Sequence, residues 1–107
     1  MPYTGSGDPD ISLYTKPPVG IDNMRIIPAL PDPRSGKIYR LRVGNDFSLD
    51  SALQVYRQLK ATGFEPVMEQ AGTMCRIFAV GVPASSVYYA VQRLGAIGFE
   101  QVWVYER

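Results

Sequence analysis

The sequence of 107 residues contains no histidine and one cysteine, Cys75. Without histidine it lacks the most common general base and metal ligand, and a thiol nucleophile would lack its usual imidazole partner. Cys75 has no second cysteine for a disulfide or a zinc site. We therefore expect no metal, no cofactor and no enzymatic activity, and we interpret Cys75 as a small hydrophobic residue that is buried or half-buried.

Strong charge and long apolar runs are also missing. Eleven Lys and Arg residues against ten Asp and Glu residues give a formal net charge of +1. This weak charge argues against bulk electrostatic binding of nucleic acid or of an acidic membrane. No apolar run is long enough to span a bilayer, so we expect no direct membrane insertion of this chain.

Proline is present but unevenly distributed. Seven of the nine prolines lie in residues 1–36, where hydrophobic periodicity is weak. We interpret this part as a Pro/Gly-rich linker whose first twenty residues are mobile. Its apolar segment 24–31 is expected to lie against the folded part, which we place at residues 37–107.

From Lys37 onward the sequence repeats itself. "YRQLKATGFEPV" (56–67) and "VQRLGAIGFEQV" (91–102) share a leucine, a Gly-Phe-Glu run and a valine at matching places, and "YRLRVG" (39–44) matches "RIFAVG" (76–81). Each half predicts a strand, a helix and a strand. The two halves predict an α+β fold of βαββαβ order. This is a ferredoxin-like or RNP-like sandwich with a four-stranded antiparallel sheet and both helices on one face.

Capping residues and glycines predict where the helices begin and end. Ser48 is a typical N-cap for the first helix and Gly63 a typical C′ residue. The second helix is expected to begin near residues 83–86 and to end at Gly98. Strands are expected near 65–71 and 100–106, the former at a sheet edge because Pro66 cannot donate to a ladder. The apolar stripe of the first helix is predicted to comprise Leu49, Ala52, Leu53, Tyr56 and Leu59.

The strand in "IYRLRVGNDF" (38–47) alternates apolar residues with two arginines. Its apolar side chains are expected to meet the helices, which places Arg40 and Arg42 on the uncovered face of the sheet. In the last strand, Trp103 and Tyr105 are expected on that face too. The alternatives are that the arginines are merely solvated and that Trp103 belongs to the core.

In the strand before the second helix, the direction of each side chain is assigned by counting back from Gly81, in the same way as from Gly44 in the first strand. This places Phe78 and Val80 toward the helices and leaves Cys75, Ile77 and Ala79 on the uncovered face. A sheet face that carries Arg, Trp and Tyr beside small apolar groups has the composition of a binding surface.

The strand "YRLRVGNDF", the helix "SALQVYRQLKATGFEPV" and the second pass "CRIFAVGVPASSVYYAVQRLGAIGF" together resemble the SPOR domain, a peptidoglycan-binding module of bacterial cell-envelope proteins. The likeness covers roughly residues 37–107 and depends on the order and spacing of Val-Gly and Gly-Phe pairs. The resemblance implies a periplasmic module that binds glycan strands stripped of stem peptides across the uncovered sheet face. It would thereby target a parent protein to the division septum.

The resemblance also implies which residues contact the glycan. Arg42 stands where the family commonly has glutamine, and Asn45 where it commonly has serine, although Asn45 could simply serve the turn after Gly44. Arg42 would favour a carboxylate such as the lactyl group of N-acetylmuramic acid. In the third strand the family's aromatic and arginine places fall on Cys75 and Ile77, one residue out of phase with Arg76. Either a bulge brings Arg76 to the uncovered face or that contact is missing. The implied glycan-binding residues are Arg40, Arg42, Asn45, Arg76, Ile77, Trp103 and Tyr105.

Two other functions remain open from the sequence. RNA-binding RRM domains have the same βαββαβ order and bind on the same sheet face, but they carry two aromatic residues in the third strand. "MCRIFAVGV" offers only Phe78, which is expected to point inward. A ferredoxin-like regulatory module for small molecules should dimerise, whereas we expect a glycan-binding module to be a monomer.

Overall fold

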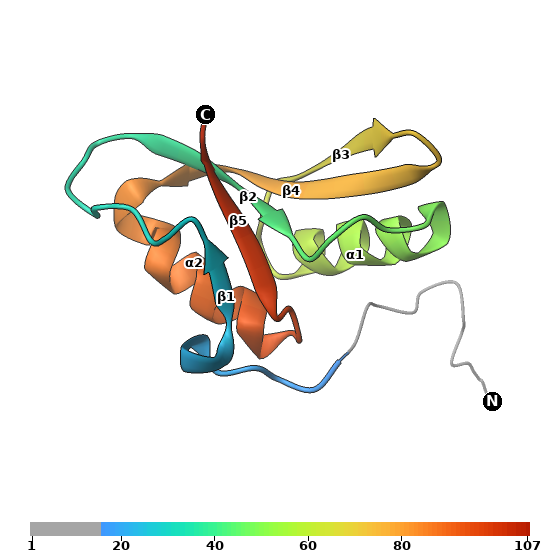
Figure 1. Cartoon of the computed structure of the whole chain (residues 1–107), viewed down its shortest axis with the longest axis horizontal. Coiled ribbons are helices and arrows are strands. Elements are labelled where there is room, and N and C mark those ends of the chain that lie inside the picture. The colour runs from blue at the N-terminus through green and yellow to red at the C-terminus, as the bar shows by residue number, and fades with distance from the viewer. Residues whose placement is uncertain (1–15) are drawn as a thin grey trace.

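A computed structural model of the chain describes residues 16–107 (Figure 1). No helix in this part is long and apolar enough to cross a membrane. In chain order the elements are the 3-10 helix η2 (Ile21–Asn23), β1 (Arg25–Ile27), β2 (Ile38–Val43), α1 (Leu49–Ala61), β3 (Pro66–Ala71), β4 (Met74–Pro83), α2 (Ala84–Ala96) and β5 (Gln101–Glu106).

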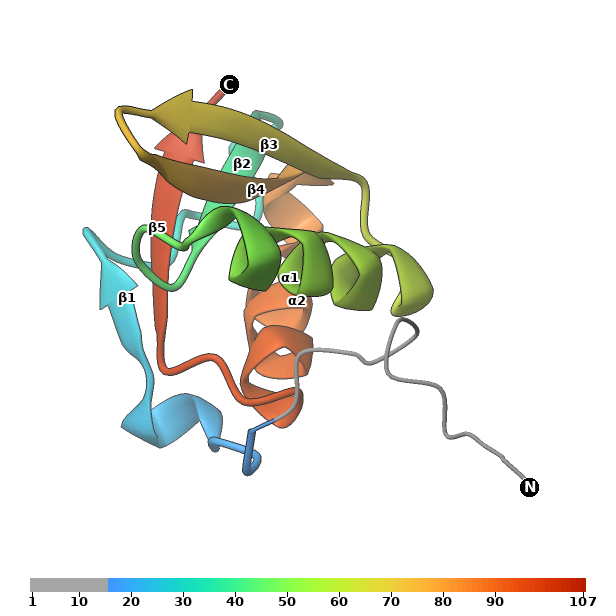
Figure 2. The same cartoon turned by 90° about the vertical axis from the view of Figure 1, so that its right-hand side faces the viewer.

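The α+β class and the predicted order of elements from β2 to β5 are confirmed. Strand β2 pairs antiparallel with β4 and β5, β3 pairs antiparallel with β4, and both helices lie on one side of the sheet (Figures 1 and 2). The prediction of a four-stranded, purely antiparallel sheet is wrong. The sheet has five strands in the order β1-β5-β2-β4-β3, and β1 pairs parallel with β5. The predicted linker therefore contributes a strand that pairs with the otherwise free edge of β5.

Residues 19–27, here called the strap, include this extra strand, which lies beside β5 in Figure 2. Backbone hydrogen bonds attach the strap to the rest of the fold. The Val19 amide donates to the Gly95 carbonyl at 2.7 Å, and the Arg25 amide donates to the Glu100 carbonyl at 2.8 Å. Met24 is buried in the core between these two bonds. Of the residues predicted to be mobile, 1–15 lie outside the described part of the chain.

The helix ends follow the predicted signals. Helix α1 begins after Ser48, whose hydroxyl accepts from the Ser51 amide at 3.3 Å. Beyond the two helices, Gly63 and Gly98 adopt φ angles of 94° and 104°, which residues other than glycine rarely adopt. Strand β3, which begins at Pro66, lies at the sheet edge as predicted.

The apolar stripe of α1 was only partly predicted. Ala52 and Leu59 are buried as expected, whereas Leu49 and Leu53 are exposed. Val55 is buried in their place, because the helix is rotated so that positions i, i+3 and i+7 from Ala52 face the sheet.

A β-bulge in β4 reverses the predicted faces of its first half. Tyr39 pairs with Val82 and Leu41 pairs with Ala79, so two residues of β4, Val80 and Gly81, oppose Arg40 alone. Gly81 has a φ of 70°, which makes it suited to such an extra residue. Because side chains alternate strictly along a strand, one additional residue moves every earlier side chain to the other face.

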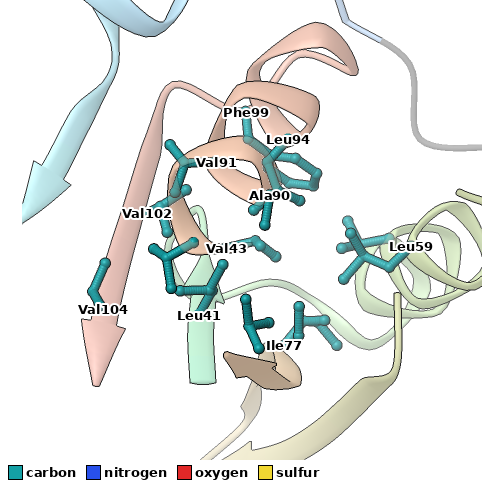
Figure 3. Close-up of a cluster of buried hydrophobic side chains, with 14 of the residues drawn as sticks. Leu41, Val43, Leu59, Ile77, Ala90, Val91, Leu94, Phe99, Val102 and Val104 are labelled. Atoms are coloured by element: carbon teal, nitrogen blue, oxygen red, sulfur yellow. The ribbon is translucent and has the colours of Figure 1, made fainter. Parts of the chain in front are cut away.

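Ile77 shows the consequence, since it points into the core between the sheet and the helices in Figure 3. The expectation that Cys75, Ile77 and Ala79 lie on the uncovered face is wrong, and all three are buried in the core cluster. The expectation that Phe78 points inward is wrong as well, because Phe78 is paired in register with the outward Arg42. The largest fully buried side chains are Phe99, Leu41, Leu59, Ile77, Leu94, Val43, Val55, Val87, Val91 and Val102.

Candidate functional site

The sheet face that the helices leave uncovered, here called the open face, has a continuous row of side chains across it. Paired residues of neighbouring strands share a face, so this row crosses all five strands. At the usual strand separation the row is about 19 Å long. From β1 to β3 its members are Ile27, Trp103, Arg42, Phe78 and Val67, and Arg40 and Tyr105 form a second pair beside it.

Trp103 lies on the open face, as predicted, and not in the core. Its neighbours Val102 and Val104 are buried toward the helices. The guanidinium carbon of Arg42 lies 5.5 Å from the centre of the Trp103 ring. The Nε1 of Trp103 and the Nε of Arg42 are buried and find no hydrogen-bond acceptor within residues 16–107. Buried donors without an acceptor are uncommon in native structures.

Arg40 lies over two neighbouring aromatic rings. Its guanidinium carbon lies 4.8 Å from the ring centre of Phe78 and 5.4 Å from that of Tyr105. The two rings are 6.3 Å apart and tilted by 53°. The side chain forms no ion pair within residues 16–107. A planar cation with a fixed orientation and no carboxylate partner is well prepared to bind a carboxylate.

Arg42 and Arg76 share one carboxylate, that of Asp46. Asp46 Oδ1 accepts from Arg42 Nη2 at 2.7 Å and from Arg76 Nε at 3.2 Å. The bulge at Gly81 brings Arg76 to the open face, which was the first of the two alternatives left by the sequence. Asp46 was not predicted as a site residue. The opposite charges of Arg42 and Asp46, four residues apart across a glycine turn, are the signal that could have found it.

The loop after β2 holds Asp46 in place through its backbone. Phe47 and Cys75 exchange backbone hydrogen bonds of 2.8 and 2.7 Å, which attach the loop to β4. Gly44 turns the chain with a φ of 63°, and a Cβ there would lie 2.9 Å from the Phe47 ring. Asp46 therefore reaches both arginines from a position that the main chain fixes.

Asn45 and Ile77 differ in their relation to the open face. The Asn45 side chain is exposed and its Oδ1 accepts from Gln101 Nε2 at 3.0 Å, so it links the loop to β5. Ile77 is fully buried under the sheet and cannot contact a ligand on the open face. The prediction that Ile77 is a glycan-binding residue is therefore wrong. Cys75 is buried, as predicted. Its side chain belongs to the core cluster on the helix side of the sheet and not to the open face.

A pocket of about 350 Å³ adjoins the open face at the loop end. It contains polar groups of both charges and the exposed Asn45. Within residues 16–107 no group of three or more His, Cys, Asp or Glu side chains is placed to hold a metal. The pocket is lined by Lys16, Arg25, Gly44, Asn45, Asp46, Phe47, Gly98, Phe99, Glu100 and Gln101.

The chain was compared with protein-family models, curated proteins and solved structures, and no match was found in any of them. The open face combines aromatic rings with guanidinium groups. Its aromatic rings suit the apolar faces of sugars or bases, and its guanidinium groups suit planar anions.

Proposed function

We propose that the open face binds glycan strands of bacterial peptidoglycan that lack stem peptides. The observation that carries the proposal is Arg40, which lies over the rings of Phe78 and Tyr105 and has no carboxylate partner in residues 16–107. A denuded strand exposes the lactyl carboxylate of each N-acetylmuramic acid, which a guanidinium binds through two hydrogen bonds. The resemblance to the SPOR domain and the ferredoxin-like arrangement that we infer for β2 to β5 support the same function.

The aromatic side chains supply the second half of the recognition. Pyranose rings present apolar C–H faces that stack on Trp and Tyr side chains. Trp103 and Tyr105 are two residues apart on β5, so both rings lie on the open face, one beside Arg42 and the other beside Arg40.

Under this proposal the protein is a non-catalytic, monomeric targeting module. It works in the periplasm or cell envelope, and it directs a parent protein to the division septum, where denuded glycan accumulates. Recognition needs one face of one chain, since the arginine and aromatic contacts described above all lie within a single sheet.

RNA binding is the second candidate function, and one observation favours it. Phe78, Trp103 and Tyr105 all lie on the open face, which removes the argument against RNA that Phe78 points inward. Phe78 is only 4% exposed, however, because Arg40 covers its ring. Phe78 itself therefore offers little ring surface to a base, and the net charge of +1 adds little attraction for a polyanion.

Co-sedimentation with purified sacculi tests the proposal. Wild-type protein is expected to pellet more strongly with amidase-treated sacculi than with intact sacculi. Arg40→Ala and Trp103→Ala are expected to lose most of this binding. Tyr88→Ala removes a 53% exposed aromatic ring from α2, on the other side of the molecule, and is expected to bind like wild type.

The outcomes separate the two candidates. Equal or absent pelleting with the two kinds of sacculi would contradict the glycan proposal. Binding of wild-type protein in a single-stranded RNA titration would then favour the RNA function, provided that Trp103→Ala weakens the binding of RNA. Loss of sacculus binding in Tyr88→Ala, with binding kept in Arg40→Ala and Trp103→Ala, would indicate that the helix side, and not the open face, is the binding surface.

A further inference from the structure

Asp46 places a carboxylate of the protein itself between two arginines of the open face. Its Oδ1 accepts from Arg42 at 2.7 Å and from Arg76 at 3.2 Å. A ligand carboxylate that bridged these two guanidinium groups would have to occupy the position of this oxygen. The bridging position is therefore already filled in the free protein.

This arrangement differs from a chance ion pair between two flexible surface side chains. The Arg42 side chain is only 13% exposed, and it packs against Trp103. The backbone bridge between Phe47 and Cys75 fixes the residue next to Asp46. Little side-chain entropy is left to oppose the contact, which is the usual reason that exposed ion pairs contribute little.

We infer that Asp46 is a specificity-determining residue of the open face. By partly neutralising Arg42 and Arg76, it leaves Arg40 as the guanidinium that binds the anions of a ligand. This inference rests on the proposed function, because it assigns the anion-binding part of the same face. Three unpaired arginines would attract any polyanion, whereas one favours a ligand whose carboxylates are isolated on sugar rings.

Because Arg42 lies next to Trp103, binding of a small anion at Arg42 can be followed by tryptophan fluorescence without any glycan. Trp103 is the single tryptophan of the sequence, and Arg42 lies 5.5 Å from its ring. We would titrate sodium acetate, at constant ionic strength balanced with chloride, and follow tryptophan fluorescence. In Asp46→Ala the bridging position is open, so acetate is expected to bind about tenfold more tightly than to wild type.

Two further variants control for charge and for size. Glu106→Ala removes an equal charge from the same sheet, where its carboxylate pairs with Lys37 at 3.2 Å, and it is expected to follow wild type. Asp46→Asn removes the charge but keeps an oxygen of the same size at the bridging position, so it is expected to gain less affinity for acetate than Asp46→Ala does. Identical acetate curves for wild type and both Asp46 variants would overturn the inference. An equal gain in Glu106→Ala would also overturn it, because net charge alone would then explain the effect.

A second arm measures specificity. Asp46→Ala is expected to gain several-fold more affinity for poly-glutamate and single-stranded RNA than for amidase-treated sacculi. If acetate binding responds to Asp46 but wild type does not pellet with sacculi, the glycan function fails and the role of Asp46 on this face stands. If wild type pellets with treated sacculi but acetate binding does not respond, the glycan function stands and the role of Asp46 fails.

Discussion

Arg40 lies with its guanidinium carbon 4.8 Å from the ring centre of Phe78, and this cation–π contact holds the positive charge over the ring. A guanidinium group carries N–H donors in a planar fork that can bind a carboxylate through two hydrogen bonds, which an ammonium group cannot do. Arg40→Lys keeps the charge but loses the fork of donors and the stacking. We expect Arg40→Lys to weaken binding to denuded glycan about tenfold. Isotherms with solubilised glycan fragments measure this, and full affinity in the lysine variant would contradict a planar contact.

The orientation of β4 makes a prediction about stability. Ile77 is fully buried, so Ile77→Ala leaves a cavity and is expected to lower the free energy of unfolding by about 2–5 kcal/mol. Arg76→Ala, one residue earlier, removes a 40% exposed side chain and is expected to cost no more than about 1 kcal/mol. Urea denaturation of both variants gives the two values. The reverse ranking would show that the faces of β4 are assigned wrongly.

The bulge that sets these faces depends on one glycine. Gly81 has a φ of 70° and open space around its Cβ position, so an alanine there is disfavoured by backbone strain and not by a clash. We expect Gly81→Ala to cost about 1–2 kcal/mol of unfolding free energy. Gly20 also has open space but no positive φ, so Gly20→Ala is the matched control and is expected to change stability by less than about 0.5 kcal/mol. Equal effects of the two substitutions would argue against strain at the bulge.

These features show what the sequence could and could not predict. The order of strands and helices follows from the repeat of residues 56–67 at 91–102, because hydrophobic periodicity and capping are local signals. The faces of β2 and β5 were predicted for the same reason. The faces of β4 were not, because Gly81 was treated like Gly44, as the glycine after a strand, whereas it lies inside a strand of ten residues.

Specific contacts between segments that are distant in the chain could not be predicted from the sequence either. The pairing of β1 with β5 joins residues more than seventy positions apart, and a three-residue strand carries too little periodicity to be recognised. Asp46 is similar, since its link to Arg76 depends on the bulge and on the bridge between Phe47 and Cys75. The site composition was predicted in outline, but which arginine is free depends on this tertiary arrangement.

The strap that carries β1 is tested by a substitution in α2. In an isolated helix Gly→Ala is stabilising by about 1 kcal/mol. Gly95, however, is covered by the strap, and a Cβ there would lie 2.4 Å from the Val19 carbonyl oxygen and 2.5 Å from Met24 Sδ. We therefore expect the opposite sign, a loss of about 1–3 kcal/mol, together with detachment of the strap.

Hydrogen exchange distinguishes detachment of the strap from general destabilisation. The Arg25 amide, which donates to the Glu100 carbonyl, is expected to lose its protection in Gly95→Ala, while amides of β2 and β4 stay protected. Ser85→Ala, at an exposed position of the same helix, is the control and is expected to leave the Arg25 amide unchanged. A more stable Gly95→Ala protein with a protected Arg25 amide would mean that the strap does not pack on α2. Because Ile27 pairs with Trp103 at the edge of the open face, detachment is also expected to weaken glycan binding, though less than Trp103→Ala does.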